Sequence, residues 1–349
     1  SNTVAGFGGT VVFMAYLVGV IVVTALAGRR EPMTLMKLGL ALSIVGLALL
    51  GFAGSVATVF IGLFLANAGA AGIWITAPGL ATAEVPAERR GLVIGFLTAS
   101  IGLGTSMLAL GTVLARSTTD NDDLWRPIYL FEGAVAAAIL GAVWLLVRSP
   151  ATAASGVGIS LTSLRRLSHW RRITAAYVIF GAIAAGYLSF LAEALETDAG
   201  LSRGAVANLY LGMGLVSVVA APFVGWLSDR FGRSVAKIGV MGGLAVGAAS
   251  IALGPTWLVA LAVLALGGLW SSYPSLTATY VRDHLDARQF GSAYGTMTIF
   301  YGAMAMVAPT GVGVLADRFG GFTVAYLAVA ALAVAGVVIL ASVPSDART

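Results

Sequence analysis

The sequence predicts an all-α polytopic membrane protein made of two six-helix bundles. Its residues are 59% hydrophobic and only 10% charged, whereas a typical soluble domain is roughly 25% charged. The charges are also clustered, since none lies between Lys37 and Glu84 or between Lys237 and Arg282. Each of these gaps is long enough for about two helical crossings of the hydrocarbon core. The third observation is an internal repeat of glycines and tryptophans.

Apolar runs predict eleven membrane spans, separated by charges or by turn-forming pairs such as Gly54-Ser55 and Gly254-Pro255. The predicted spans are residues 7–28, 33–53, 56–82, 91–115, 127–147, 173–196, 204–227, 237–253, 256–281, 289–315 and 321–343.

Lys and Arg are distributed unevenly between the two sets of loops. Sixteen of the twenty lie in the set that includes Arg29, Arg89 and Arg230. The other set holds Arg116, Arg126, Arg203 and Arg318. Because basic loops are retained in the cytoplasm, we expect the N-terminus of this chain outside, its C-terminus inside, and a location in the cytoplasmic membrane.

The two halves share spaced residues, as an internal repeat requires. Lys37 and Gly39 recur as Lys237 and Gly239, and the glycine set Gly91, Gly95, Gly102 and Gly111 recurs as Gly291, Gly295, Gly302 and Gly311. The pair Trp74 and Pro78 recurs as Trp270 and Pro274. The second half has six spans and the first has five, so we expect a twelfth helix that precedes residue 7. The predicted parts are a first bundle at 1–147, a cytoplasmic linker at 148–172 and a second bundle at 173–349.

Composition argues against several other classes of protein. The chain has no cysteine, and its two histidines, His169 and His284, fall in predicted loops, so we expect neither a metal site nor a cofactor. Basic residues lie between spans rather than along one stripe, which argues against nucleic acid binding. The predicted spans contain no cluster of His, Asp and Glu, so an enzyme is not expected.

One loop motif resembles a known family. The run from Gly225 to Arg233, Gly-Trp-Leu-Ser-Asp-Arg-Phe-Gly-Arg, is similar to the signature that follows the eighth helix of the major facilitator superfamily. Its first-half counterpart at residues 24–30 is degenerate and has lost the aspartate. The resemblance implies two bundles related by a pseudo-two-fold axis along the membrane normal, with a central cavity and alternating access.

The resemblance assigns a gating role to this motif. Asp229 is expected at the N-terminus of the helix that starts near Gly91, where the helix dipole favours a carboxylate. The residues implied in this contact between the bundles are Gly225, Asp229, Arg230, Arg233, Arg89 and Arg90. The alternative is a solvated pair of loop charges, which would contribute little.

The chain also departs from the family pattern. Proton-coupled members often carry an arginine where Leu65 stands, and drug–proton antiporters often carry a proline in the helix that contains Gly102. Both absences argue against a multidrug antiporter.

In this family the first, fourth, seventh and tenth helices line the cavity. The fourth, seventh and tenth correspond here to residues 56–82, 173–196 and 256–281, and the first corresponds to the helix expected before residue 7. The candidate substrate-binding residues are Asn67, Trp74, Tyr177, Tyr187, Trp270, Ser271, Tyr273 and Tyr301. Further polar candidates are Ser189, Ser272, Ser275, Tyr294 and Thr298. The alternative is ordinary helix packing, because serines often allow close contact between membrane helices.

Carboxylates within predicted spans are candidates for proton coupling because they are costly in hydrocarbon. These are Glu132, Glu193 and Glu196. Glu193 is the best candidate, because it lies nearer the apolar part of its span than Glu196, and Glu132 is the second. The alternative is that all three extend to the outer interface. No basic residue is expected to be buried within the predicted spans, which favours a neutral, zwitterionic or amphipathic solute.

The expected function is therefore that of a monomeric secondary transporter of a small organic solute, with protons as the coupling ion. Two alternatives stay open from the sequence. One is an exporter of hydrophobic or drug-like compounds, and the other is a non-transporting receptor or scaffold with the same fold.

Overall fold

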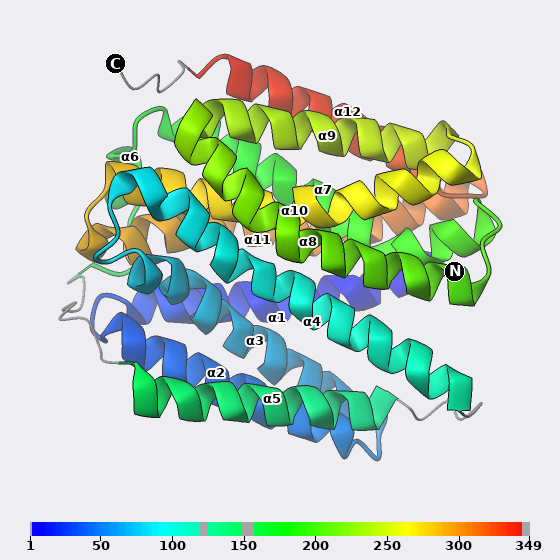
Figure 1. Cartoon of the computed structure of the whole chain (residues 1–349), viewed down its shortest axis with the longest axis horizontal. Coiled ribbons are helices and arrows are strands. Elements are labelled where there is room, and N and C mark those ends of the chain that lie inside the picture. The colour runs from blue at the N-terminus through cyan, green and yellow to red at the C-terminus, as the bar shows by residue number, and fades with distance from the viewer. Residues whose placement is uncertain (1, 119–124, 148–156, 344–349) are drawn as a thin grey trace.

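The structure, a computed structural model, describes residues 2–118, 125–147 and 157–343. Within these ranges the chain is helical and forms no strand. Eleven of its helices are long and apolar enough to cross a membrane, which confirms the predicted all-α fold and the predicted number of spans (Figure 1).

The first group of long helices comprises α1 (Asn2–Leu26), α2 (Pro32–Gly51), α3 (Val56–Ala81), α4 (Arg90–Thr118) and α5 (Trp125–Leu146). The second comprises α7 (Trp170–Thr197), α8 (Arg203–Phe231), α9 (Arg233–Leu253), α10 (Thr256–His284), α11 (Ala287–Phe319) and α12 (Thr323–Ala341). Two short helices, η1 (Ala87–Arg89) and α6 (Leu161–Arg165), lie in the loops before α4 and α7.

Several helices extend beyond the predicted spans. Helix α8 continues to Phe231 and α9 begins at Arg233, although the apolar runs stop at 227 and resume at 237. Hydropathy marks the hydrocarbon layer, whereas a helix can continue into the polar interface. The break comes at Gly232, whose φ of 96° is open to glycine but strained for other residues.

The two groups have the same internal packing. Helix α3 packs against α1 and α2, and α10 packs in the same way against α8 and α9. The α2–α5 contact is matched by α9–α12. Helix α7 packs against α11 and α12, and no helix of the described residues takes the equivalent place against α4 and α5.

Two helix pairs form most of the contact between the bundles, α4 with α8 and α1 with α11. Small residues allow the backbones to approach closely, as is usual between membrane helices. A Cβ atom added to Gly102 would lie only 2.6 Å from the Gly214 carbonyl oxygen. The two pairs occupy repeat-related positions, so each bundle contributes the same two helices to the interface.

The molecule has two ends. The end that carries the arginine-rich loops, which we call the basic face, includes the α1–α2 loop at Arg29, the α8–α9 loop and α6, and lies on the left of Figure 1. At the opposite face, the Asp317 carboxylate of α11 accepts hydrogen bonds from the Asn2 and Thr3 backbone N–H groups, both at 2.9 Å. A carboxylate at the start of α1 also complements the helix dipole, so the α1–α11 contact is fastened at this end.

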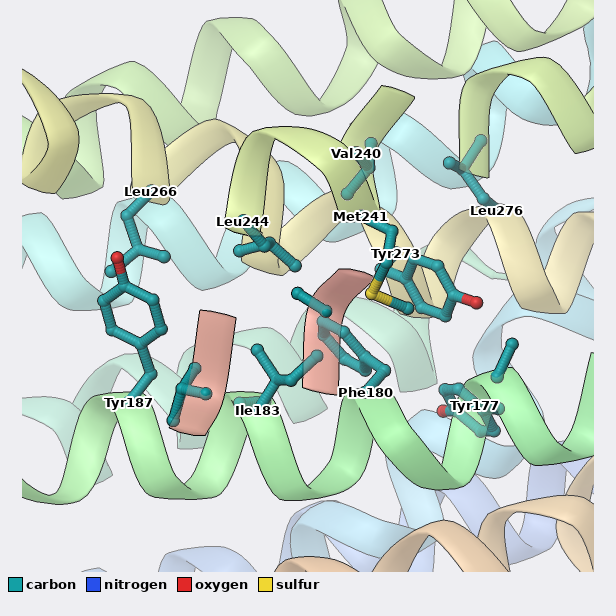
Figure 2. Close-up of a cluster of buried hydrophobic side chains, with 14 of the residues drawn as sticks. Tyr177, Phe180, Ile183, Tyr187, Val240, Met241, Leu244, Leu266, Tyr273 and Leu276 are labelled. Carbon is teal, nitrogen blue, oxygen red and sulfur yellow. The ribbon is translucent and has the colours of Figure 1, made fainter. Parts of the chain in front are cut away.

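A cluster of buried apolar side chains lies mainly in the second bundle. Figure 2 shows Tyr177, Phe180, Ile183 and Tyr187 of α7 among the buried side chains of α9 and α10. This packed core holds α7 in place within its own bundle.

Candidate functional site

A cavity of about 550 Å³ lies between the two bundles. Helices α1, α3 and α4 supply one wall, and α7, α10 and α11 supply the other. Its lining residues are Val12, Phe13, Tyr16, Asn67, Ala70, Ile73, Trp74, Ala77, Leu97, Ser100, Ile101, Tyr177, Ala184, Leu188, Trp270, Pro274 and Tyr301. Six of them are aromatic, and none carries a charge.

Five of the predicted substrate-binding residues are on this wall: Asn67, Trp74, Tyr177, Trp270 and Tyr301. The two repeat-related tryptophans face the same space from different bundles. Each precedes a proline by four residues, Pro78 in α3 and Pro274 in α10. A proline at that spacing frees the tryptophan's carbonyl from the helix hydrogen-bond ladder.

Three other candidates lie outside the cavity wall, and the first is Ser271. Its hydroxyl is fully buried, donates to the Gly267 carbonyl at 2.8 Å and lies 2.8 Å from the Ser217 hydroxyl of α8. The side chain therefore joins two helices of one bundle, which is a packing role and not a cavity role.

Tyr187 and Tyr273 point into the second bundle. The Tyr187 ring meets Tyr326 of α12 edge-on, with centroids 5.2 Å apart. The Tyr273 ring stacks on Phe180 at 4.6 Å, behind the cavity wall. Both side chains are almost completely buried, since α7 and α10 each present one face to the cavity and another to their own bundle.

Two aromatic residues of the wall, Phe13 and Tyr16 on α1, are absent from the sequence-based candidates. The family pattern directed attention to other helices. A usable signal was present, because two aromatic residues three positions apart share one face of a helix.

Stacked rings continue from the cavity toward the basic face. Tyr177 stacks on Tyr301 with centroids 4.7 Å apart, and its hydroxyl lies 3.4 Å from that of Tyr294. Tyr294 in turn stacks on Phe290, with ring centroids 5.2 Å apart. Phe290 lies in the first turn of α11. A Cβ atom on Gly79 of α3 would come within 2.8 Å of the Phe290 ring. This aromatic column therefore fills the region between the cavity and the basic face.

At the basic face, Asp229 fastens α8 to α4. Its carboxylate accepts hydrogen bonds from the Gly91 N–H at 3.0 Å and the Leu92 N–H at 2.8 Å. These are unpaired donors of the first turn of α4, so the carboxylate caps that helix. The backbones meet at Gly91 and Gly225, where a Cβ atom on Gly91 would be 2.5 Å from the Gly225 carbonyl oxygen.

Arg233 lies at the centre of the same network. Its guanidinium contacts the Asp229 carboxylate, donates to the Ser228 hydroxyl at 2.7 Å and donates to the Asp283 carboxylate of α10 at 2.9 Å. It also donates to the Ala87 carbonyl at 3.1 Å. Only 5% of the Arg233 side chain and 6% of the Asp229 side chain are exposed. Buried charge pairs of this kind need such complete hydrogen bonding.

Arg90 extends the network across the bundle interface. Its guanidinium lies 3.2 Å from Asp283 and also donates to the Arg282 carbonyl. We call Arg90, Asp229, Arg233 and Asp283 the charge latch. Asp283 was not among the sequence-based candidates, because it lies far from the motif in sequence and no pattern marks it.

Two residues proposed for gating take no part in the charge latch. Arg230 is exposed, and its guanidinium lies over the rings of Trp226 and Phe231. Arg89 is exposed, on the short helix before α4.

The acidic candidates lie away from the cavity wall. Glu193 is exposed near the opposite-face end of α7, and Glu132 is half-buried on α5. Glu196 pairs with Arg203 at 3.6 Å, at the edge of a cleft of about 820 Å³ between α4, α7 and α8. That cleft is larger than the central cavity, but it lies at the opposite face, away from the repeat-related tryptophans.

Two matched bundles with a cavity between them and a closure at one end form the arrangement typical of a membrane transporter. Comparison with known families agrees. The family model of the Major Facilitator Superfamily matches residues 1–309 and, in a second match, residues 173–348. The chain belongs to this superfamily and is a transporter, not an enzyme.

Solved transporters have the same fold. The human organic anion transporter MFSD10 (TETRAN) aligns with a TM-score of 0.77 and 14% identity, over 97% of this chain and 83% of its own. The proton:xylose symporter XylE, bound to 6-bromo-6-deoxy-D-glucose, aligns at 0.75 and 15%, over 99% and 95%. A variant of the E. coli fucose:proton symporter FucP aligns at 0.68 and 18%, over 100% and 94%. No protein with a curated description matches the chain.

Proposed function

We propose that the protein is a secondary active transporter of a small organic solute that has an apolar or aromatic body and no net negative charge. The observation that carries this proposal is the central cavity, whose wall has six aromatic side chains and no charged one. Aromatic rings gain contact area and favourable stacking with flat apolar ligands. An anion would lose its hydration without a paired cation on the described wall, which is costly.

The few polar groups on the wall support a ligand with a small polar part. Asn67 uses one amide hydrogen on the Leu63 carbonyl of its own helix, and the amide has further hydrogen-bonding capacity. Tyr16 and Trp270 add further donor groups to the wall. The Ser100 hydroxyl donates to the Leu97 carbonyl of its own helix and can still accept a hydrogen bond. Ligand sites of this kind combine an apolar wall with a few polar groups that set orientation.

The proposed orientation puts the basic face in the cytoplasm, because Lys and Arg are retained there. The bundles at 1–147 and 173–349 then close on the cytoplasmic side through the charge latch. Such a structure favours access to the cavity from outside. We place the protein as a monomer in the cytoplasmic membrane.

An exporter of hydrophobic compounds is the second candidate, and the apolar wall of the cavity supports it.

The direction of transport is tested in proteoliposomes of known orientation. A metabolite library is first screened by thermal shift, because a ligand that binds only the folded protein raises its melting temperature. Hits are then tested for counterflow. A proton-driven transporter accumulates the hit and exchanges it, whereas absence of exchange with every hit would indicate a receptor or scaffold.

Proton coupling is tested at two acids. We expect Glu132→Gln to lower proton-driven accumulation and to leave counterflow intact. A half-buried carboxylate in a membrane helix is energetically costly, and such residues commonly have a functional role. Glu193 is exposed at the end of α7, so Glu193→Gln is expected to accumulate the solute like the unmodified protein. The measurement is accumulation against counterflow for both variants. Normal accumulation by Glu132→Gln would exclude that residue as the coupling acid.

A further inference from the structure

Residues 157–168 cross the basic face just before α7, and we call them the linker strap. The strap contains α6, which lies at the left edge of Figure 1. The helix is short, but its start is well formed, since the Ser160 hydroxyl accepts a hydrogen bond from the Ser163 N–H at 3.1 Å. Leu164 and Leu167 are almost completely buried. The strap is therefore packed into the protein and is not a solvated connection.

Hydrogen bonds attach the strap to the second bundle. The Ser160 N–H donates to the Thr296 hydroxyl of α11 at 3.0 Å, and the Ser292 hydroxyl donates to the Gly158 carbonyl at 2.5 Å. Near α7, the Tyr280 hydroxyl of α10 donates to the Ser168 carbonyl at 2.9 Å. Ser292 and Thr296 are four residues apart and lie on one face of α11.

Close backbone packing attaches the strap to the first bundle. A Cβ atom on Gly28, just after α1, would lie 2.8 Å from the Gly158 nitrogen. A Cβ atom on Gly158 would lie 2.9 Å from the Ala25 carbonyl oxygen of α1. The two glycines allow a contact that a side chain at either position would prevent. The strap thus touches both members of the α1–α11 pair.

The repeat explains why this pair needs a separate closure. The α4–α8 pair is fastened at the basic face by Asp229. When residues 24–30 are aligned with the motif that begins at Gly225, Gly28 takes the place of Asp229. The α1–α11 pair therefore has no carboxylate at the repeat-related position, and the backbone of Gly158 packs there instead.

We propose that the linker strap is the second closure of the basic face, with Ser292 and Thr296 as gating residues. This inference rests on the alternating access proposed above. Opening of the basic face requires α1 to move away from α11, and the strap packs on α1 while it is hydrogen-bonded to α11. The strap must release α1 each time the cavity opens to this side, so its contacts stabilise the closed state.

The test measures access to the cavity without any substrate. The chain has no cysteine, so Ala77→Cys on the cavity wall can serve as a single reporter thiol. Inside-out vesicles are treated with a membrane-impermeant maleimide from the basic face. In this background, Ser292→Ala with Thr296→Val removes both hydrogen bonds to the strap. We expect labelling to rise roughly five- to thirtyfold, the change that two ordinary hydrogen bonds correspond to.

A second variant and a control complete the experiment. Gly158→Val keeps both hydroxyls but forces the strap away from Ala25, so it is expected to raise labelling as well. If the double variant does not fold, labelling of Gly158→Val tests the gating role of the strap. Thr279→Val is the matched control, because that hydroxyl donates to the Ser275 carbonyl of its own helix. Labelling of folded Gly158→Val protein at the control rate would overturn the inference. Since no solute is used, that result is distinct from a failure of the proposed transport.

Discussion

Asp229→Asn is expected to open the basic face and to lower the transport rate by at least roughly tenfold. The carboxylate accepts two backbone hydrogen bonds from α4 and faces Arg233. An amide can replace one acceptor oxygen but offers no charge to the guanidinium. A hydrogen bond to a charged group contributes about 2 kcal/mol, which corresponds to a factor of about thirty in the balance between closed and open states. A transporter held in one state completes its cycle slowly.

Arg230→Gln is the matched control for this prediction. It changes the neighbouring charge in the last turn of α8, but the Arg230 guanidinium lies over the aromatic rings of Trp226 and Phe231 and not in the charge latch. Expression and melting temperature should be similar for both variants. The measurement is the initial rate with a solute from the thermal-shift screen, together with maleimide labelling of Ala77→Cys from the basic face. Equal labelling in the two variants would show that Asp229 does not hold the basic face closed.

The position of Asp229 could be predicted from the sequence because a local motif fixes it. The motif places the aspartate near the end of α8, and the family resemblance implies the helix that it meets. The partner of Arg233 could not be predicted in the same way. Asp283 is fifty residues away in the chain, and nothing in its local sequence distinguishes a carboxylate that joins a network from one that faces water.

The positions of the membrane spans could be predicted from the sequence, whereas the direction in which each side chain points around its helix could not. Hydrocarbon excludes charge, so the gap between Lys237 and Arg282 in the sequence translates directly into two crossings. Around each helix, however, lipid and protein neighbours are both apolar, and hydrophobic periodicity is weak. Trp270 and Ser271 are adjacent in sequence but face the cavity and α8, respectively. Only the packing of the helices decides between these two directions.

The same limit applies to the linker strap. Its sequence is short, polar and rich in small residues, which predicts a loop and gives no sign of a partner. Its position depends on two glycines in different segments, Gly28 and Gly158, whose backbones meet. Contacts between backbones leave little trace in a single sequence beyond the glycines themselves.

Trp270→Ala is expected to weaken solute binding by about 2 kcal/mol or more, the loss usual for an aromatic residue at the centre of a binding site. This corresponds to at least about a thirtyfold rise in Kd. The indole lies on the cavity wall together with Trp74, which occupies the repeat-related place in the other bundle. A flat solute between them would contact both ring systems, so truncation of either removes one side of the site. The measurement is Kd by calorimetry or by the concentration dependence of the thermal shift.

Two further variants distinguish a binding role from a structural one. Trp270→Phe keeps a ring on the wall and is expected to recover most of the affinity, while Trp257→Ala removes an indole from the exposed start of the same helix, where 65% of the residue is accessible. Trp257→Ala should leave Kd unchanged. If Trp270→Ala lowers the melting temperature of the ligand-free protein but binds the solute with unchanged affinity, the indole is a packing residue and the site lies elsewhere on the wall. A rise in Kd with an unchanged ligand-free melting temperature assigns it to the solute, because only the bound state has then lost a contact.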